Sequence, residues 1–319
     1  MRPFFENNVL QQQPFKPMII VVDTTKAGSA SNTFVLPIIK DTTETVKIYW
    51  GDGTNSTGVT GNNTHVYAVG GIYTIEIESK IFGGLYFNNL GDKAKITKIA
   101  NYGQGVSRLN IGSFFGCSSL LSIDIGNIVS NGADATNQYR GCTALTTVPL
   151  LNLSSVTNAF AMFAYCAALT TVPLLNLSSV TNASSMFTDC TSLTTIPLLD
   201  LSSVTNATNM FRNCTSLTTV PLLNLSNCTT ATNMFRNCTS LTTIPLLDLS
   251  SVTDATNMFT GVTLTTQSYS DFLINLATLP LQSGVSFHGG NSKYNPTAAI
   301  ARAYLISNFG WTITDGGAA

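Results

Sequence analysis

A segment of 24 residues repeats five times in succession in the middle of this 319-residue chain. The copies align on one cysteine each and begin at Cys142, Cys166, Cys190, Cys214 and Cys238. A proline and a Met-Phe pair keep the same step, and an imperfect earlier copy surrounds Cys117. One such segment cannot bury its own apolar side chains, so the copies must stack and share them. The sequence therefore predicts a stack of similar coils with one continuous core.

Each repeat divides into an extended half and a returning half. The extended half carries the leucine-rich-repeat spacing, in the third copy at Leu193, Ile196, Leu198 and Leu201. Strand alternation predicts that Leu198 points inward while Pro197 and Leu199 point outward. The apolar residues that follow recur at three-to-four spacing, which favours a short helical or 3₁₀ return.

The repeat M-F-x-x-C-x-x-L-T-x-I-P-x-L-[ND]-x-S-x-V-T-N resembles the BspA-like leucine-rich repeats of bacterial surface proteins and of related phage proteins. The resemblance covers about residues 105–262 and implies attachment to other molecules in general terms. The copies depart from the common form by carrying two leucines after the proline. This departure predicts an exposed column at Leu151, Leu175, Leu199, Leu223 and Leu247.

Residues 18 to about 95 consist of apolar β-type runs separated by Gly, Asn and Asp turns, which is typical of a β-sandwich. The segment TVKIYWGDGTNSTGVTGNNTHVYAVGGIYTIEI resembles PKD-type immunoglobulin-like domains. Trp50 and Tyr73 are predicted to lie in the sandwich core, and residues 51–53 to form a turn between strands.

Beyond Gly261 the repeat stops and two helical segments follow, SYSDFLINLATL and NPTAAIARAYLISNFG. Asn295 is the expected N-cap of the second helix, Pro296 its first residue, and Gly310 its C-terminal turn. VSFHG and WTIT are predicted to be short strands. This part should cover the open end of the stack.

The predicted fold is therefore mainly β, in four parts. An extended arm (1–17) precedes an immunoglobulin- or PKD-like sandwich (18–96), a leucine-rich-repeat-like solenoid (97–262) and an α/β cap (263–319). The arm is polar and proline-containing, and two interpretations stay open for it. It is either a disordered leader or a docking peptide for an assembly, with Phe4, Phe5 and Phe15 as its apolar contacts.

The composition argues against several classes of partner. Charged residues make up 10% of the chain and the formal net charge is -1. Nucleic acids and anionic membranes attract clustered Lys and Arg, which are missing here. No stretch reaches the ~18 apolar residues that span a bilayer, and no signal-peptide core is visible near the N-terminus. We expect no nucleic-acid partner and no membrane insertion.

The seven cysteines first suggest disulfides or a metal site, but six of them occur once per repeat. Equivalent Cβ atoms in stacked coils lie farther apart than a disulfide prefers, so a buried column of free thiols is expected. Cys228 replaces the usual valine of the repeat and is expected in the core. A pairing with Cys214 or Cys238 is the alternative.

We find no constellation of catalytic residues in the sequence, and we expect no enzyme activity and no cofactor. Only His65 and His288 could act as general bases at neutral pH, and neither lies in a hydrolase-like motif. Asp52 with Asp23, Asp41 or Glu44 could in principle hold calcium. A dense set of ligands is missing, so a plain turn aspartate is preferred and no metal is expected.

Asparagines recur at one position of the repeat, at Asn158, Asn182 and Asn206, where stacked amides can form a polar ladder. Asp254 interrupts this run near the last coil. Stacked carboxylates repel, so a charge is tolerated only where the stack ends.

The predicted binding surface is an outward strip of proline and leucine: Pro173, Leu175, Pro197, Leu199, Pro221 and Leu223. The alternative is that these leucines turn into the core. An exposed strip would bind protein partners, a cell-surface receptor or a glycan, or join subunits of a particle. The favoured function is a structural or receptor-binding virion component, with a virion or extracellular location. A secreted bacterial adhesin and an intracellular scaffold are the alternatives.

Overall fold

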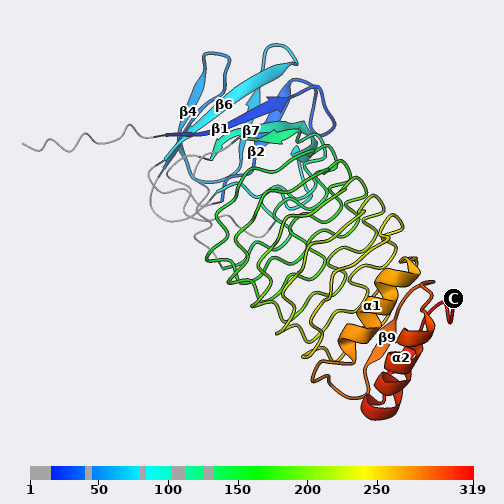
Figure 1. Ribbon diagram of the computed structural model, residues 1–319. Helices are drawn as coiled ribbons and strands as arrows, with labels where there is room; N and C mark the ends of the chain where they lie inside the picture. The colour runs from blue at the N-terminus through cyan, green and yellow to red at the C-terminus, as the bar shows by residue number, and fades with distance from the viewer. Residues whose placement is uncertain (1–15, 40–44, 80–83, 103–111, 125–132) are drawn as a thin grey trace, which may run out of the picture.

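The computed structural model describes residues 16–39, 45–79, 84–102, 112–124 and 133–319. Figure 1 shows a β-sheet unit, a long stack of coils and an α/β cap, which follow one another in space as they do in sequence. The proposed arm contacts Phe4, Phe5 and Phe15 lie outside the described residues.

The β-sheet unit contains two sheets, and strand alternation decides which side chains they bury. In β1 (Met18–Asp23) every second residue is buried, because successive side chains point to opposite faces of the sheet. β1 lies between β6 (Ile72–Glu78) and β7 (Ile96–Tyr102). The larger sheet has the order β4-β3-β6-β1-β7-β8. Its other strands are β3 (Val46–Tyr49), β4 (Asn55–Val59) and β8 (Ser122–Ile123), and the second sheet pairs β2 (Thr33–Leu36) with β5 (Asn63–Val66).

The aromatic residues that suggested a sandwich gather between the two sheets and at their edge. Trp50 is buried, and it stacks on His65 with a centroid distance of 4.7 Å. Tyr67 stacks on Tyr73 at 3.7 Å, and its hydroxyl donates a hydrogen bond to the carbonyl oxygen of Trp50. Residues 51–53 form the predicted turn between β3 and β4. Likeness to PKD-type domains stays a prediction.

A buried ion pair ties the loop before β2 to the start of the stack. Lys95, in the 3₁₀ helix η1 (Lys93–Lys95), is fully buried and lies 3.7 Å from the Asp92 carboxylate. Its ammonium group donates to the carbonyl oxygens of Ala30 at 2.9 Å and Thr33 at 2.6 Å. The Asp92 carboxylate accepts the backbone N–H of Ser29 at 2.6 Å. The buried charges are therefore compensated by backbone groups as well as by each other.

The sheet and the stack share a segment, so the predicted boundary after residue 96 runs through continuous structure. Residues 84–102 supply β7 to the sheet and also form the first layer of the stack. The N–H of Phe87 bonds to the carbonyl oxygen of Ser113 at 3.0 Å, and the Phe87 and Phe114 rings lie 6.2 Å apart. The sequence of this first layer departs from the repeat, so it gives no signal of where the stack begins.

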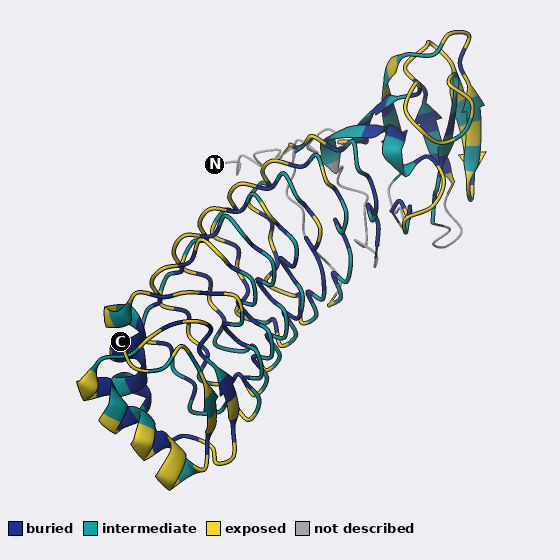
Figure 2. Ribbon diagram, turned by 90° about the vertical axis from the view of Figure 1, so that its right-hand side faces the viewer, coloured by how far each residue is buried: buried dark blue, intermediate teal, exposed yellow. Residues whose placement is uncertain are grey.

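Successive 24-residue segments stack in register as coils, which gives the stack its ladder of parallel chains (Figure 1). Alternate backbone N–H groups donate to the next coil, as from Phe211 to Met234 and from Asn213 to Arg236. One aromatic ring per coil is buried, with neighbouring centroids 5.4 to 5.9 Å apart. This column consists of Phe114, Tyr139, Phe163, Phe187, Phe211, Phe235 and Phe259. Figure 2 shows buried and exposed segments recurring from coil to coil along the stack.

The returning half of each coil is a chain of turns and not the predicted helix. Asn209 and Asn213 have φ angles of 57° and 60°, and the same two positions are left-handed in neighbouring coils. Left-handed residues interrupt any helix, and asparagine tolerates this conformation better than most residues. The three-to-four apolar spacing of this half therefore comes from consecutive turns that each place one side chain inward.

The cap has the predicted elements: α1 (Thr266–Leu276), β9 (Ser286–His288), α2 (Pro296–Phe309) and β10 (Thr312–Thr314). The Asn295 side chain accepts the N–H of Ala298 as an N-cap, and Gly310 ends α2 with a φ of 66°. The N–H of Phe259 donates to the carbonyl oxygen of His288 at 3.0 Å, so β9 takes the place of a further coil. The cap thereby covers the apolar end of the stack.

Candidate binding surface

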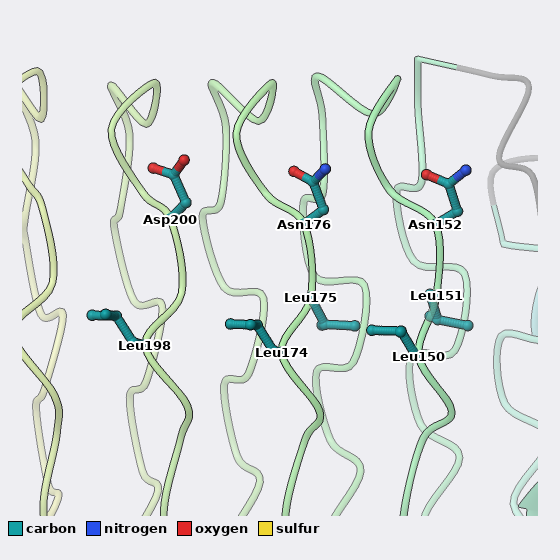
Figure 3. Close-up of a pocket in the computed structure, with 8 residues that line it drawn as sticks. All are labelled: Leu150, Leu151, Asn152, Leu174, Leu175, Asn176, Leu198 and Asp200. Atoms are coloured by element: carbon teal, nitrogen blue, oxygen red, sulfur yellow. The ribbon is translucent and has the colours of Figure 1, made fainter.

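One leucine of each of the five 24-residue repeats projects from the stack, and the five form a row along it. This leucine row consists of Leu150, Leu174, Leu198, Leu222 and Leu246, which are 49 to 61% exposed. Leu150, Leu174 and Leu198 point in the same direction in Figure 3. Large apolar side chains that lie exposed in register are uncommon on a surface of Thr, Ser and Asn, and such patches mark interaction sites.

The predicted strip names the wrong leucine of each Leu-Leu pair. Leu175, Leu199 and Leu223 are each 1% exposed, whereas the preceding leucines form the row. Buried positions in this half recur every third residue, at 193, 196 and 199, instead of every second. Proline fixes φ near −65°, which suits a polyproline-type chain of three residues per turn. The proline thus replaces the two-residue alternation that the prediction assumed.

The prolines of the predicted strip lie beside the leucine row. Pro173, Pro197 and Pro221 are half-buried, so they are at the surface without projecting from it. The last ladder hydrogen bond before Pro197 runs from the N–H of Thr194 to the carbonyl oxygen of Thr170, at 3.1 Å. The missing N–H of proline lies beyond that bond, where the chain leaves the ladder.

A groove of about 610 Å³ runs between the leucine row and a parallel row of polar side chains. Its polar side consists of Asn152, Asn176 and Asp200, which lie above the leucines in Figure 3. Hydrogen bonds from the hydroxyl and the backbone N–H of Ser202 lower the pKa of the Asp200 carboxyl, so Asp200 is ionised at neutral pH. The groove therefore offers an apolar wall and a hydrogen-bonding wall along three coils.

A second groove, of about 700 Å³, lies where the leucine row meets the cap. Leu246 and Ile244 form one side of it, and Ile274 and Asp271 of α1 form the other. The apolar surface therefore extends from the coils onto the first helix of the cap.

The predicted column of thiols is confirmed, since all seven cysteines are free and buried. In the five cysteines that begin the repeats, Sγ donates to the carbonyl oxygen of an aromatic residue in the preceding coil, as Cys214 does to Phe187 at 3.1 Å. Burial raises the pKa of Cys166 and Cys238 to about 12. Cys228 occupies the valine position as predicted, and burial raises its pKa to about 11. These thiols are therefore poor nucleophiles.

The predicted asparagine ladder is present at Asn158 and Asn182, and Asn206 continues the column through a backbone bridge to Asn182. The Asn182 amide donates to the Asn158 carbonyl oxygen at 3.0 Å, and the Asn158 amide to the Asp134 carboxylate at 3.3 Å. A second ladder, which the sequence analysis did not predict, joins Asp189, Asn213 and Asn237. The Asn213 amide donates to the Asp189 carboxylate at 2.8 Å, and the Asn237 amide donates to the Asn213 carbonyl oxygen at 2.9 Å. Its sequence signal is asparagine at the end of each Met-Phe-Arg-Asn segment.

The two histidines lie far from the leucine row in sequence and have structural partners. His65 Nε2 lies 2.8 Å from the Asp52 carboxylate, which also accepts the Thr54 hydroxyl at 2.6 Å. His288 Nδ1 accepts the N–H of Gly290 at 3.0 Å.

Within the described residues, no group of three or more His, Cys, Asp or Glu side chains is placed to hold a metal ion. No helix of the described part has the length and apolar character to cross a membrane.

Comparison with known proteins points to the repeated part of the chain. A family model described as Mycoplasma protein of unknown function, DUF285, matches residues 133–243 and 157–272. A leucine-rich repeat protein from Bacteroides ovatus, known from its crystal structure, is 13% identical, with 84% of this chain and 98% of that chain covered and a TM-score of 0.20. No curated protein matched the chain. The coils and the start of the cap are therefore similar to DUF285 repeats, whose description assigns no function.

Proposed function

We propose that this chain is a non-enzymatic surface protein of the BspA-like leucine-rich-repeat kind, and that its coil stack binds a protein partner along the leucine row. The observation that carries the proposal is the register of the five exposed leucines. An isolated exposed leucine is ordinary, but five in one row form a continuous apolar edge. A partner that covers this edge removes it from water, which is favourable in proportion to the buried apolar area.

The two walls of the groove support a protein as the partner. The leucines provide an apolar wall, and Asn176 and Asp200 provide hydrogen-bonding groups beside it. Protein interfaces combine an apolar centre with such a polar rim. The regular step of the coils repeats both walls, so the partner can be long and need not fit a single pocket.

The test compares the wild type with L174N/L198N/L222N, three substitutions at exposed positions that leave the core unchanged. Labelled protein is applied to immobilised extracellular-matrix proteins and to whole bacterial cells. We expect saturable binding to at least one of these surfaces and a loss of more than tenfold in the triple variant, since three apolar contacts are removed. Equal binding by both proteins, or no binding by the wild type, would overturn the proposal.

Ile300→Asn serves as the matched control, because Ile300 is exposed on α2 and lies outside the leucine row. This variant should bind as the wild type does. Thermal unfolding of all the proteins should coincide, which would show that lost binding does not reflect lost structure.

The location of the protein is a separate part of the proposal. A surface protein of a cell and a component of a phage particle would use the same leucine row, and the resemblance to BspA-like repeats includes phage proteins. Mass spectrometry of purified particles and of the cell-surface fraction distinguishes the two locations. Finding the chain in neither would contradict the surface role.

A further inference from the structure

Arginine is concentrated in one column of the stack. The described part of the chain contains four arginines, and three of them, Arg140, Arg212 and Arg236, occupy the same position of the 24-residue repeat. The fourth, Arg302, is bound to the Asp315 carboxylate at 2.8 Å in the cap. The remaining surface of the coils is mostly Thr, Ser and Asn, so this arginine column is distinct in its charge.

Arg212 and Arg236 follow each other in adjacent coils. Equivalent backbone positions of paired parallel chains lie about 4.8 Å apart, so the two side chains start side by side. Within the described residues neither forms an ion pair, and the buried Nε atom of each has no hydrogen-bond partner. Asp189, one coil earlier and one position along, accepts the amide of Asn213 at 2.8 Å instead. Two neighbouring cations thus lie together without a bound counter-charge.

Arg140, the third arginine of the column, has aromatic neighbours. The Arg140 guanidinium lies 5.2 Å from the ring centroids of both Phe115 and Tyr165, so two aromatic faces stabilise it. Arg212 and Arg236 are flanked by Asn213 and Asn237, which offer no aromatic face. Their charge is therefore available to a ligand.

We propose that Arg212 and Arg236 together bind an oxyanion group, a carboxylate or a sulfate, of an acidic glycan. Guanidinium groups present parallel N–H donors that match the two oxygens of such a group. The adjoining Asn213 and Asn237 each use one amide hydrogen in the ladder, and the second hydrogen of each NH2 group can donate to a sugar hydroxyl. This site is independent of the leucine row and of the partner proposed for it.

The experiment measures binding of the full chain to four polymers by titration calorimetry. Chondroitin sulfate carries carboxylates and sulfates, hyaluronan carries carboxylates alone, dextran is neutral, and poly-glutamate is an acidic peptide. We expect binding to one or both acidic glycans, no binding to dextran, and affinity that falls with added salt. R212Q/R236Q should lose more than tenfold in affinity. R212K/R236K should bind with an affinity between those of R212Q/R236Q and the wild type, because lysine keeps the charge but lacks the paired N–H donors of the guanidinium group.

K26Q/K293Q is the matched control, since it removes the same amount of charge from exposed positions outside the stack. It should bind as the wild type does. The proposal is overturned if the wild type binds neither acidic glycan, or if the control loses as much affinity as R212Q/R236Q. Tighter binding of poly-glutamate than of either glycan would overturn it in favour of an acidic peptide. Coincident thermal unfolding of the variants establishes that each is folded.

Discussion

The coil stack and the β-sheet unit are held together in opposite ways. In the stack each side chain meets a copy of itself in the next coil: Phe211 lies between Phe187 and Phe235, at 5.6 Å from each. In the β-sheet unit each buried group meets a different partner, as Lys95 meets the loop carbonyl oxygens of Ala30 and Thr33. One region therefore depends on register, and the other on individual contacts.

This difference determines which parts of the molecule a destabilising substitution affects. A substitution in a repeated column disturbs the coils above and below it, because each layer contacts only its neighbours. In a network of unique contacts, the loss of one member leaves its own partners unpaired.

The largest effect should follow from a gap in the aromatic column. Phe211→Ala removes a fully buried ring and its contacts with two others, and should lower the free energy of unfolding by about 4 kcal/mol. Urea unfolding followed by circular dichroism measures the loss. Leu198→Ala, at an exposed position of the same 24-residue segment, should change the free energy of unfolding by less than about 0.5 kcal/mol. Similar losses in both variants would contradict the assignment of the core.

The next effect concerns the buried ion pair of the β-sheet unit. Lys95→Met fills the space of the lysine stem but leaves the buried Asp92 carboxylate without its cation, which should cost about 3 kcal/mol. Hydrogen exchange should show the loss in β1 and β2, with the coils beyond residue 142 protected as in the wild type. The double variant D92N/K95M should recover part of the stability, because it removes both charges. If exchange rises equally in all the coils, the two regions do not differ as described.

The features that sequence predicted correctly are those that the repeat determines. A period of 24 residues gives each cysteine and each Asn158-type amide a copy of itself as neighbour, so burial of the thiols and the amide ladder follow from register alone. The ends of α2 were also predictable, because Asn295, Pro296 and Gly310 act through local geometry.

The features that sequence missed depend on backbone conformation or on single distant contacts. The choice between Leu198 and Leu199 as the exposed residue depended on a three-residue period that proline imposes within an apparent strand. The returning half of the coil has the apolar spacing of a helix, but its left-handed residues Asn209 and Asn213 prevent one from forming. Asparagine at both positions is a sequence signal for such turns. The burial of Lys95 offered no signal, since the residues that accept its hydrogen bonds lie more than 60 residues earlier in the chain.

A smaller effect separates the polar ladder of the stack from its backbone geometry. The Asn213 side chain forms hydrogen bonds with Asp189 and Asn237, and its backbone has a φ of 60°. Asn213→Gly removes these hydrogen bonds and keeps the backbone unstrained, at a cost of about 1 kcal/mol. Asn213→Ala also strains the backbone, so its cost should be about 2 kcal/mol. Urea unfolding distinguishes the two. Equal losses would mean that the left-handed conformation contributes no strain at this position.

The smallest effect concerns the Asp52 carboxyl of the β-sheet unit, and its size should change only at acid pH. Partial burial opposes ionisation of Asp52, but hydrogen bonds from Thr54 and His65 outweigh it and lower the pKa of the carboxyl to about 2. An unfolded aspartate has a pKa of about 3.9, so this carboxylate stabilises the folded protein above pH ~4 and ceases to do so as the pH falls towards 2. The melting temperature of the wild type should therefore exceed that of Asp52→Asn at pH 6, and the difference should shrink between pH 4 and pH 2.

The pH dependence of this difference isolates Asp52 from the carboxylates of the stack. Hydrogen bonds also lower the pKa of Asp200, and that residue is present in both proteins, so its contribution cancels. Asp200→Asn is the matched control. The Asp200 carboxylate lies in the stack and accepts the backbone N–H of Ser202, as the Asp52 carboxylate accepts that of Thr54. If the difference between the wild type and Asp52→Asn persists unchanged at pH 2, the contribution of Asp52 is one of shape and not of charge. The β-sheet unit would then share the dependence on uncharged contacts that characterises the stack.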